Sequence, residues 1–208
     1  MENLARPSWK VLDIGSGGGV LALPLAKNNC NIVAIEPSSA MRSLINRNAI
    51  NINNNDIMID TRRWEDVSVQ DYYKYDLIIA CNSLHLTSIG FRDGLCKIFH
   101  AGPKNIFVVT EKLYPAVVEM AEYSNYTMFC SASYEVESSF VYHNIDEAIE
   151  HWTLLKGSVL KSEEQDDIIS RLVCRDSHYV IRDRACINLF WWKETDEELT
   201  MIKTSGGI

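Results

Sequence analysis

The sequence contains six cysteines but no pair with the C-x-x-C spacing of a zinc cluster or a dithiol redox motif. It also lacks an apolar core near the N-terminus of the kind found in secretion signals, and no apolar run reaches the length of a membrane span. These absences predict a cytoplasmic protein with no structural metal site and no membrane association.

Basic residues are scarce as well. The 20 lysines and arginines are outnumbered by 28 aspartates and glutamates, which gives a formal net charge of -8. A protein that binds nucleic acid normally carries a basic stripe, because it must neutralise phosphates. The charge balance therefore disfavours RNA or DNA as the substrate and favours a small molecule.

Short apolar runs alternate with amphipathic segments in the first half of the chain, which is the pattern of a parallel sheet covered by helices. There we expect strands at 10–14, 32–35, 57–59, 75–81 and 105–111, and helices at 21–27, 38–49, 90–99 and 115–126. In the second half we expect strands at 134–142 and 185–193, and helices at 146–155 and 163–174. Neither a repeat nor a long linker divides the chain, so residues 1–208 are expected to form one domain.

The segment VLDIGSGGGV, residues 11–20, places glycines between the first expected strand and the first helix. Gly15 and Gly17 can adopt backbone angles that a side chain would forbid, so a ligand can touch the main chain there. A carboxylate at Asp13 favours a ligand with a cationic amino group or a sulfonium centre over an anionic pyrophosphate. Val20 stands where the dinucleotide fingerprint needs a small residue. A glycine-rich turn without a nucleotide is the alternative at this point.

The second expected strand ends at Glu36. A carboxylate at the tip of this strand can accept hydrogen bonds from both hydroxyls of a ribose. Because parallel strands end at the same edge of a sheet, Glu36 should lie beside the glycine loop. The two features together predict a site for a nucleoside that bears a cationic tail.

With these residues the sequence resembles the class I S-adenosylmethionine-dependent methyltransferases, especially their small-molecule branch. The resemblance is carried by VLDIGSGGG at 11–19, VAIEPSSAMRSLINRNA at 33–49 and YDLIIACNSLHLT at 75–87. It implies a Rossmann-like, doubly wound α/β fold with a mostly parallel seven-stranded sheet and an antiparallel final strand. Residues 1–130 would form the cofactor-binding half. Residues 131–208 would complete the sheet and form the acceptor pocket.

The same resemblance implies S-adenosylmethionine as the cofactor. Gly15 and Gly17 would approach its methionine part, and Asp13 would orient its amino group. Glu36 would hold its ribose. The full set of expected cofactor contacts is Asp13, Gly15, Ser16, Gly17, Gly19, Glu36, Pro37, Met41, Arg63, Trp64 and Asn82.

The adenine end of the expected site departs from the family pattern. The family contacts the adenine amino group with an acidic or polar residue just past the third strand. There this chain has DTRRWEDV at 60–67, which offers Asp60, Arg63, Trp64 and Glu65. We expect the Arg63–Trp64 segment to contact adenine. The alternative is that Trp64 packs beneath the loop.

The chemistry is expected after the fourth strand. Asn82 follows it, across the crevice from the glycine loop, and should face the methyl donor. His85 is the candidate base, because imidazole titrates near neutral pH. It could instead cap the following loop. The sequence Asn-Pro-Pro-Tyr, which holds a planar nitrogen in related enzymes, is absent, and this points away from DNA-adenine and protein-glutamine acceptors.

The sequence therefore predicts methyl transfer from S-adenosylmethionine to a small-molecule acceptor that it does not identify. The alternatives are an NAD(P)-dependent oxidoreductase on a similar fold and a non-catalytic module that binds S-adenosylmethionine or a nucleotide. Only a few residues precede the first strand, so a lid over the cofactor would come from residues 140–155, from residues 157–174, or from the second subunit of a homodimer.

Overall fold

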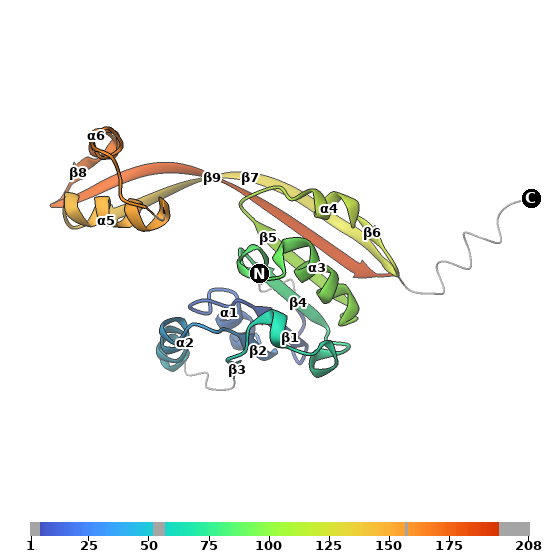
Figure 1. The fold of residues 1–208 in the computed structure, drawn as a ribbon. Coiled ribbons are helices and arrows are strands. Elements are labelled where there is room, and N and C mark those ends of the chain that lie inside the picture. Colours follow the sequence, from blue (N-terminus) through green and yellow to red (C-terminus); the bar gives the residue numbers. More distant parts are fainter. Residues whose placement is uncertain (1–4, 52–56, 157, 196–208) are drawn as a thin grey trace, which may run out of the picture. The chain divides into compact units, whose positions relative to one another are not determined.

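The computed structural model describes residues 5–51, 57–156 and 158–195, which divide into two compact units (Figure 1). Unit 1 runs to Ser133 and resumes at Asn188, and unit 2 comprises Tyr134–Ile187. Two long strands, β7 (Tyr126–Tyr142) and β9 (His178–Glu194), contribute residues to both units. The expectation of a single domain over residues 1–208 stays a prediction.

Five parallel strands form one side of the sheet in unit 1. In the spatial order β3-β2-β1-β4-β5, these strands are Met58–Asp60, Asn31–Ile35, Lys10–Ile14, Leu77–Cys81 and Asn105–Thr110. β9 pairs with β5 in the antiparallel direction, and β7 and the short strand β6 (Glu122–Tyr123) follow it. The predicted fold class is confirmed: a mixed α/β fold with a mostly parallel sheet and an antiparallel edge. The expected number of seven strands was wrong, because the sheet of the described residues has nine.

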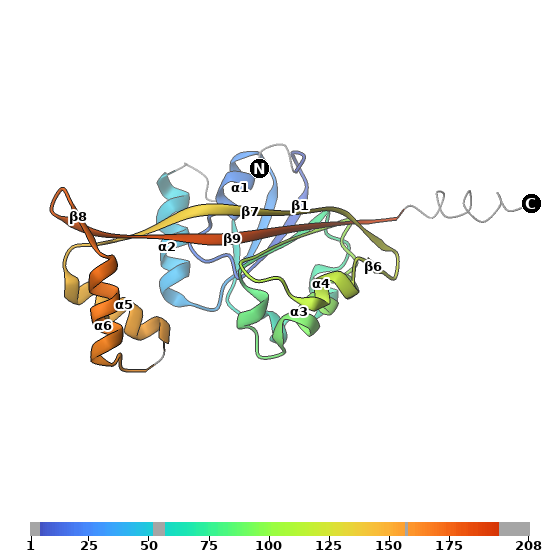
Figure 2. The same cartoon turned by 90° about the horizontal axis from the view of Figure 1, so that it is seen from above.

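Six α-helices are seen in the described residues. They are α1 (Ala22–Lys27), α2 (Ser39–Asn51), α3 (Gly90–His100), α4 (Pro115–Glu119), α5 (Ile145–Lys156) and α6 (Ser162–Arg171). Three short 3-10 helices, η1 (Trp64–Asp66), η2 (Val69–Tyr72) and η3 (Leu84–Leu86), lie in the connections of unit 1. In unit 2, α5 and α6 lie side by side in both views (Figures 1 and 2).

Apolar residues bury both faces of the parallel sheet. Successive side chains of a strand point to opposite faces. Val11 accordingly packs with Leu25 of α1 in one cluster, whereas Leu12 packs with Leu95 of α3 in the other. Figure 2 shows α1 and α3 on opposite sides of the sheet. Strands covered on both faces need a continuous apolar sequence. This explains why these strands could be predicted from short apolar runs.

Two expected helices end early, and these predictions were wrong at their C-terminal ends. The helix expected at 115–126 ends at Glu119, and β6 pairs with β7 through a turn that begins at Ser124, where φ is +55°. The helix expected at 163–174 ends at Arg171 and gives way to β8 (Val173–Arg175). β8 pairs with β9 around the turn Asp176–Ser177, where both φ angles are positive. Neither turn contains glycine, so the usual sequence signal of a tight hairpin is missing.

No helix in the described ranges is long and apolar enough to cross a bilayer. Within the same ranges, no group of three or more His, Cys, Asp or Glu side chains is arranged to hold a metal ion.

Candidate functional site

A cavity of about 690 Å³ lies at the carboxyl ends of the parallel strands in unit 1. This is where open α/β sheets bind their ligands, and the volume suits a small molecule or cofactor. The lining comes from the ends of β1, β2 and β4 and from the segment after β3: Ile14, Gly15, Gly17, Ile35, Glu36, Pro37, Ser38, Met41, Arg63, Trp64, Glu65, Asn82, Ser83, Leu86 and Thr87.

The glycine loop is tied to the end of β2. The backbone N–H groups of Gly15 and Ser16 donate to the Ile35 carbonyl at 2.8 and 3.1 Å. Gly15 and Gly17 both have left-handed backbone angles, with φ of +66° and +55°. Such angles are costly for residues with a Cβ, so glycine is required for the loop to take this path.

The Glu36 carboxylate joins the loop to the tip of β2. Its Oε2 accepts from the Gly17 N–H and its Oε1 from the Ser38 N–H, both at 2.8 Å. Only 6% of the residue is exposed, and it lines the cavity. Each carboxylate oxygen can accept more than one hydrogen bond. Glu36 is therefore held in place and can still accept hydrogen bonds from a ligand hydroxyl.

Three buried polar atoms near the loop have no hydrogen-bond partner in the described part of the chain: Asp13 Oδ2, Ser16 Oγ and Ser83 Oγ. Buried polar groups are normally hydrogen-bonded, so such a cluster fits a polar ligand. Burial, followed by the negative charge of Glu36, raises the pKa of Asp13 to about 7. A cationic ligand group would favour its ionised form. Asp13 itself lies behind the lining of the cavity.

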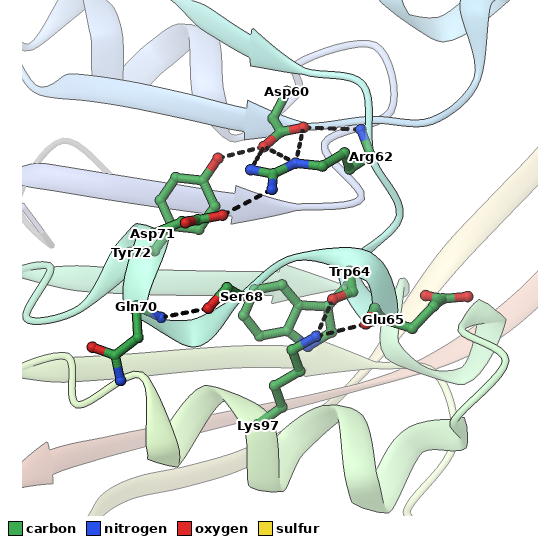
Figure 3. Close-up of polar contacts among 9 residues, drawn as sticks. All are labelled: Asp60, Arg62, Trp64, Glu65, Ser68, Gln70, Asp71, Tyr72 and Lys97. Atoms are coloured by element: carbon green, nitrogen blue, oxygen red, sulfur yellow. Dashed lines mark hydrogen bonds and ion pairs between the residues drawn. The ribbon is translucent and has the colours of Figure 1, made fainter.

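Asp60, at the end of β3, is engaged by its own neighbours (Figure 3). Arg62 reaches its carboxylate through Nη2 at 2.7 Å, and the Tyr72 hydroxyl donates to the same oxygen. Arg62 also donates to Asp71 at 2.8 Å. These bonds, with that of Arg62 as the largest cause, lower the pKa of Asp60 to about 2. The Asp60 carboxylate is thus occupied by hydrogen bonds within the protein, and it is not part of the cavity lining.

The Trp64 ring is buried against α3, and contact of the Arg63–Trp64 segment with adenine stays a prediction. Only 2% of the residue is exposed, and its indole N–H donates to the Gly94 carbonyl of α3 at 3.0 Å. Lys97 of α3 donates to the Trp64 and Glu65 carbonyls at 2.6 and 2.9 Å and lies over the indole ring (Figure 3). α3 therefore positions this part of the cavity wall, and Arg63 and Glu65 are its charged residues.

Asn82 and His85 follow β4 but have different surroundings. Asn82 lines the cavity with φ of +48°, a left-handed angle that asparagine tolerates better than most residues. Its side chain is bonded to Glu111, which follows β5. His85 is exposed on η3, with its ring stacked on Tyr114 at 6.5 Å between centroids, and it lies outside the cavity lining. A role of His85 as the base stays a prediction.

The cavity brings together most of the expected cofactor contacts: Gly15, Gly17, Glu36, Pro37, Met41, Arg63, Trp64 and Asn82. Asp13, Ser16 and Gly19 lie outside its lining. The lining also includes residues that were not predicted from the sequence and that flank expected residues in the same loops: Ser38, Ser83, Leu86 and Thr87. Their place after strand ends was the signal that could have identified them. Direct contact of each residue with a cofactor stays a prediction.

Comparison with known proteins gives matches in sequence and in fold. Residues 11–101 match a family model described as a methyltransferase domain. The ubiquinone biosynthesis O-methyltransferase of Rickettsia typhi is 28% identical over 119 residues, which are 55% of this chain and 47% of that protein. The match therefore spans about half the length of that relative.

Solved structures of methyltransferases share the fold. A candidate methyltransferase of Bacillus halodurans has a TM-score of 0.63 at 11% identity, over 93% of this chain and 95% of that one. The magnesium protoporphyrin IX methyltransferase of Synechocystis, solved with S-adenosylmethionine bound, has a TM-score of 0.53 at 11% identity, over 88% and 70%. At such identities the likeness establishes the fold alone.

Proposed function

We propose that the chain is a class I S-adenosylmethionine-dependent methyltransferase that transfers a methyl group to a small organic molecule. The observation that carries the proposal is the Glu36 carboxylate. It is buried at the tip of β2, held by the Gly17 and Ser38 N–H groups, and lines the cavity. This arrangement suits the hydroxyls of a ribose placed against the glycine loop.

The polar groups around the loop fit the remainder of S-adenosylmethionine. The partnerless Oδ2 of Asp13 would face its cationic amino group, and the hydroxyls of Ser16 and Ser83 would donate to its carboxylate. Among the charged residues of the lining, Glu36 and Glu65 are acidic and Arg63 is basic. This balance favours a cationic cofactor over a dinucleotide with its anionic pyrophosphate.

The bound cofactor supplies a methyl group on a positively charged sulfur, which makes that carbon electrophilic. The task of the protein is to hold the acceptor atom in line with the C–S bond at contact distance. The segment 82–87, which follows β4 and contributes four residues to the lining, would provide this placement. A small acceptor is supported by the acidic net charge of -8 and by the likeness to the ubiquinone biosynthesis O-methyltransferase of Rickettsia typhi.

The cofactor part of the proposal is tested by calorimetric titration of the purified protein with S-adenosylmethionine, S-adenosylhomocysteine and NAD. We expect both sulfur compounds to bind and NAD not to bind. Binding of NAD alone would instead support an oxidoreductase.

The acceptor part is tested with cofactor labelled in its methyl group. The protein and the labelled cofactor are incubated with a low-molecular-weight cell extract and, separately, with total RNA from the same cells. Label is expected in a small molecule. Label that appears in RNA and in no small molecule would contradict the proposed acceptor class.

A further inference from the structure

A polar pair joins the carboxyl ends of β4 and β5 beside the cavity. The Asn82 Nδ2 donates to Glu111 Oε1 at 3.2 Å, and the Glu111 N–H donates to Asn82 Oδ1 at 3.0 Å. The Asn82 N–H in turn donates to the Val109 carbonyl at 2.9 Å, which continues the pairing of the two strands. Since Asn82 lines the cavity, these reciprocal bonds hold the Glu111 carboxylate one side chain away from it.

The backbone of Asn82 is left-handed, with a φ of +48°, an angle that asparagine adopts at less cost than most residues with a Cβ. The bond from Asn82 engages only Oε1 of Glu111, whose side chain is exposed. The Oε2 of Glu111 can therefore accept a further hydrogen bond.

Strand pairing brings Glu111 to the sheet edge that carries the glycine loop. Cys81 ends β4, and its pKa is raised to about 11 by burial, then by the charge of Asp13, and then by that of Glu111. β4 pairs on one side with β1, which leads into the glycine loop, and on the other with β5, which leads to Glu111. Because parallel strands end at the same edge of a sheet, Glu111 lies at the edge that carries the glycine loop.

The same two segments also present an apolar and aromatic surface. Leu86, after β4, is 76% exposed, and Leu113, after β5, is 63% exposed. The Tyr114 ring stacks on the Phe91 ring, with centroids 4.0 Å apart and planes 7° apart. It also stacks on the His85 ring, with centroids 6.5 Å apart. Exposed apolar side chains beside a polar pair are typical of a site for a small ligand with an apolar body.

We propose that Glu111 is the base of the methyl transfer and that the acceptor is a planar aromatic molecule whose hydroxyl group is methylated. This inference rests on the function proposed above. An electron pair of the hydroxyl oxygen forms the new O–C bond, and the C–S bond breaks with its electrons passing to sulfur. The hydroxyl proton passes to the Glu111 carboxylate, so the positive charge lost at sulfur is balanced. Asn82 is a positioning residue, because it acts by orienting Glu111.

The test uses 4-nitrocatechol, a coloured aromatic diol, and protein saturated with S-adenosylhomocysteine. In Glu111→Gln the amide oxygen can still accept from Asn82, but the negative charge and the proton acceptor are lost. At a pH at which the probe is neutral, we expect this change to weaken probe binding by about 10-fold. Turnover of the probe with S-adenosylmethionine should fall by about 100-fold or more, with affinity for S-adenosylhomocysteine unchanged.

Two further variants separate the roles. Glu119→Gln is the matched control, because Glu119 is an exposed glutamate of unit 1 that pairs with Arg92 at 3.4 Å. It should change neither binding nor turnover. Asn82→Gly keeps the left-handed backbone and removes the side chain, so turnover should fall less than in Glu111→Gln. Adding it to Glu111→Gln should cost nothing more, because the two residues act as a unit.

Several results would overturn the inference. If the wild type binds S-adenosylhomocysteine but not 4-nitrocatechol, the acceptor class is wrong. If Glu111→Gln binds and turns over the probe like the wild type, Glu111 is not the base, and a loss confined to His85→Ala would assign that role to His85. If the wild type binds no S-adenosylhomocysteine, the proposed function fails and this inference fails with it.

Discussion

Gly15 and Gly17 are two residues apart and have similar backbone angles, yet a side chain added at each would meet different surroundings. A Cβ on Gly15 would lie 2.5 Å from the Cβ of Ser83, well inside contact distance. A Cβ on Gly17 would meet nothing within 4 Å. The first glycine allows the loop to pack against the segment after β4. The second keeps the main chain open to the cavity.

This difference predicts different outcomes for two alanine variants. Gly15→Ala should lower the free energy of unfolding by about 2–4 kcal/mol, through a clash and a strained φ. Gly17→Ala should cost only about 1–2 kcal/mol of stability, from the strained φ alone. It should nevertheless weaken S-adenosylhomocysteine binding, because its methyl group occupies the ligand side of the loop. Urea denaturation and calorimetry measure the two effects, and undiminished binding by Gly17→Ala would contradict the assignment.

The raised pKa of Asp13 predicts that protein stability and cofactor affinity depend on pH in opposite directions. Its pKa in the folded protein is raised to about 7 from the ordinary 3.8, so folding favours the protonated form. Its contribution to the stability of the ligand-free protein is fully present below the unfolded-state pKa and is lost as the pH rises through about 7. Binding of a cationic amino group needs the ionised form, so cofactor affinity should increase over the same range.

Calorimetry in buffers of different ionisation enthalpy measures this linkage directly. Below about pH 7, S-adenosylmethionine binding should release protons from the wild type. In Asp13→Asn the release should disappear, because the amide cannot ionise. Equal proton release by both proteins would show that another group titrates on binding.

Among the elements, α3 links the core to the wall of the cavity. Lys97 donates to two carbonyls of η1 and lies over the Trp64 ring, and Gly94 accepts from the indole. These contacts hold the segment that contains Arg63 and Glu65. A change on α3, about 30 residues from η1 in the chain, should therefore reach the cofactor site through η1.

Lys97→Met keeps much of the apolar stem and removes the charged donor. We expect a loss of about 1–3 kcal/mol in unfolding free energy, because two carbonyls lose a charged partner. Cofactor affinity should fall as well. Lys104→Met is the control, since Lys104 is 65% exposed in a surface pair with Asp76 and should contribute about 1 kcal/mol or less. Equal effects of the two changes in chemical denaturation would contradict the role assigned to η1.

The elements also show which features of the site could be predicted from the sequence. Glu36 and Asn82 directly follow buried strands, so local pattern and strand direction place them at the same sheet edge. The burial of Trp64 could not be predicted in this way, because it depends on Gly94 and Lys97, about 30 residues away. The capture of Asp60 by Arg62 and Tyr72 likewise depends on side-chain geometry that the spacing does not reveal.

At the scale of the whole molecule, the expected cofactor contacts and the proposed base all lie in unit 1. Unit 2 has a small core of its own, formed by Tyr142, Ala148, Leu160, Ile168 and Ile181. Substitutions in unit 1 can therefore test the prediction that residues 131–208 form the acceptor pocket. If Glu111 and the aromatic surface around Tyr114 hold the acceptor, substitutions at these two positions in unit 1 should change which acceptor molecules are methylated.

Calorimetric titration with S-adenosylhomocysteine, comparing the wild type with Glu36→Ala, tests whether Glu36 holds the cofactor ribose. We expect the wild type to bind and the variant to bind more weakly by about 1–3 kcal/mol, through lost charged hydrogen bonds to the ribose. Glu36→Gln, which retains one carbonyl oxygen as an acceptor, should give an intermediate loss. Thermal unfolding of each variant confirms that it is folded. A folded Glu36→Ala with the affinity of the wild type would contradict the account.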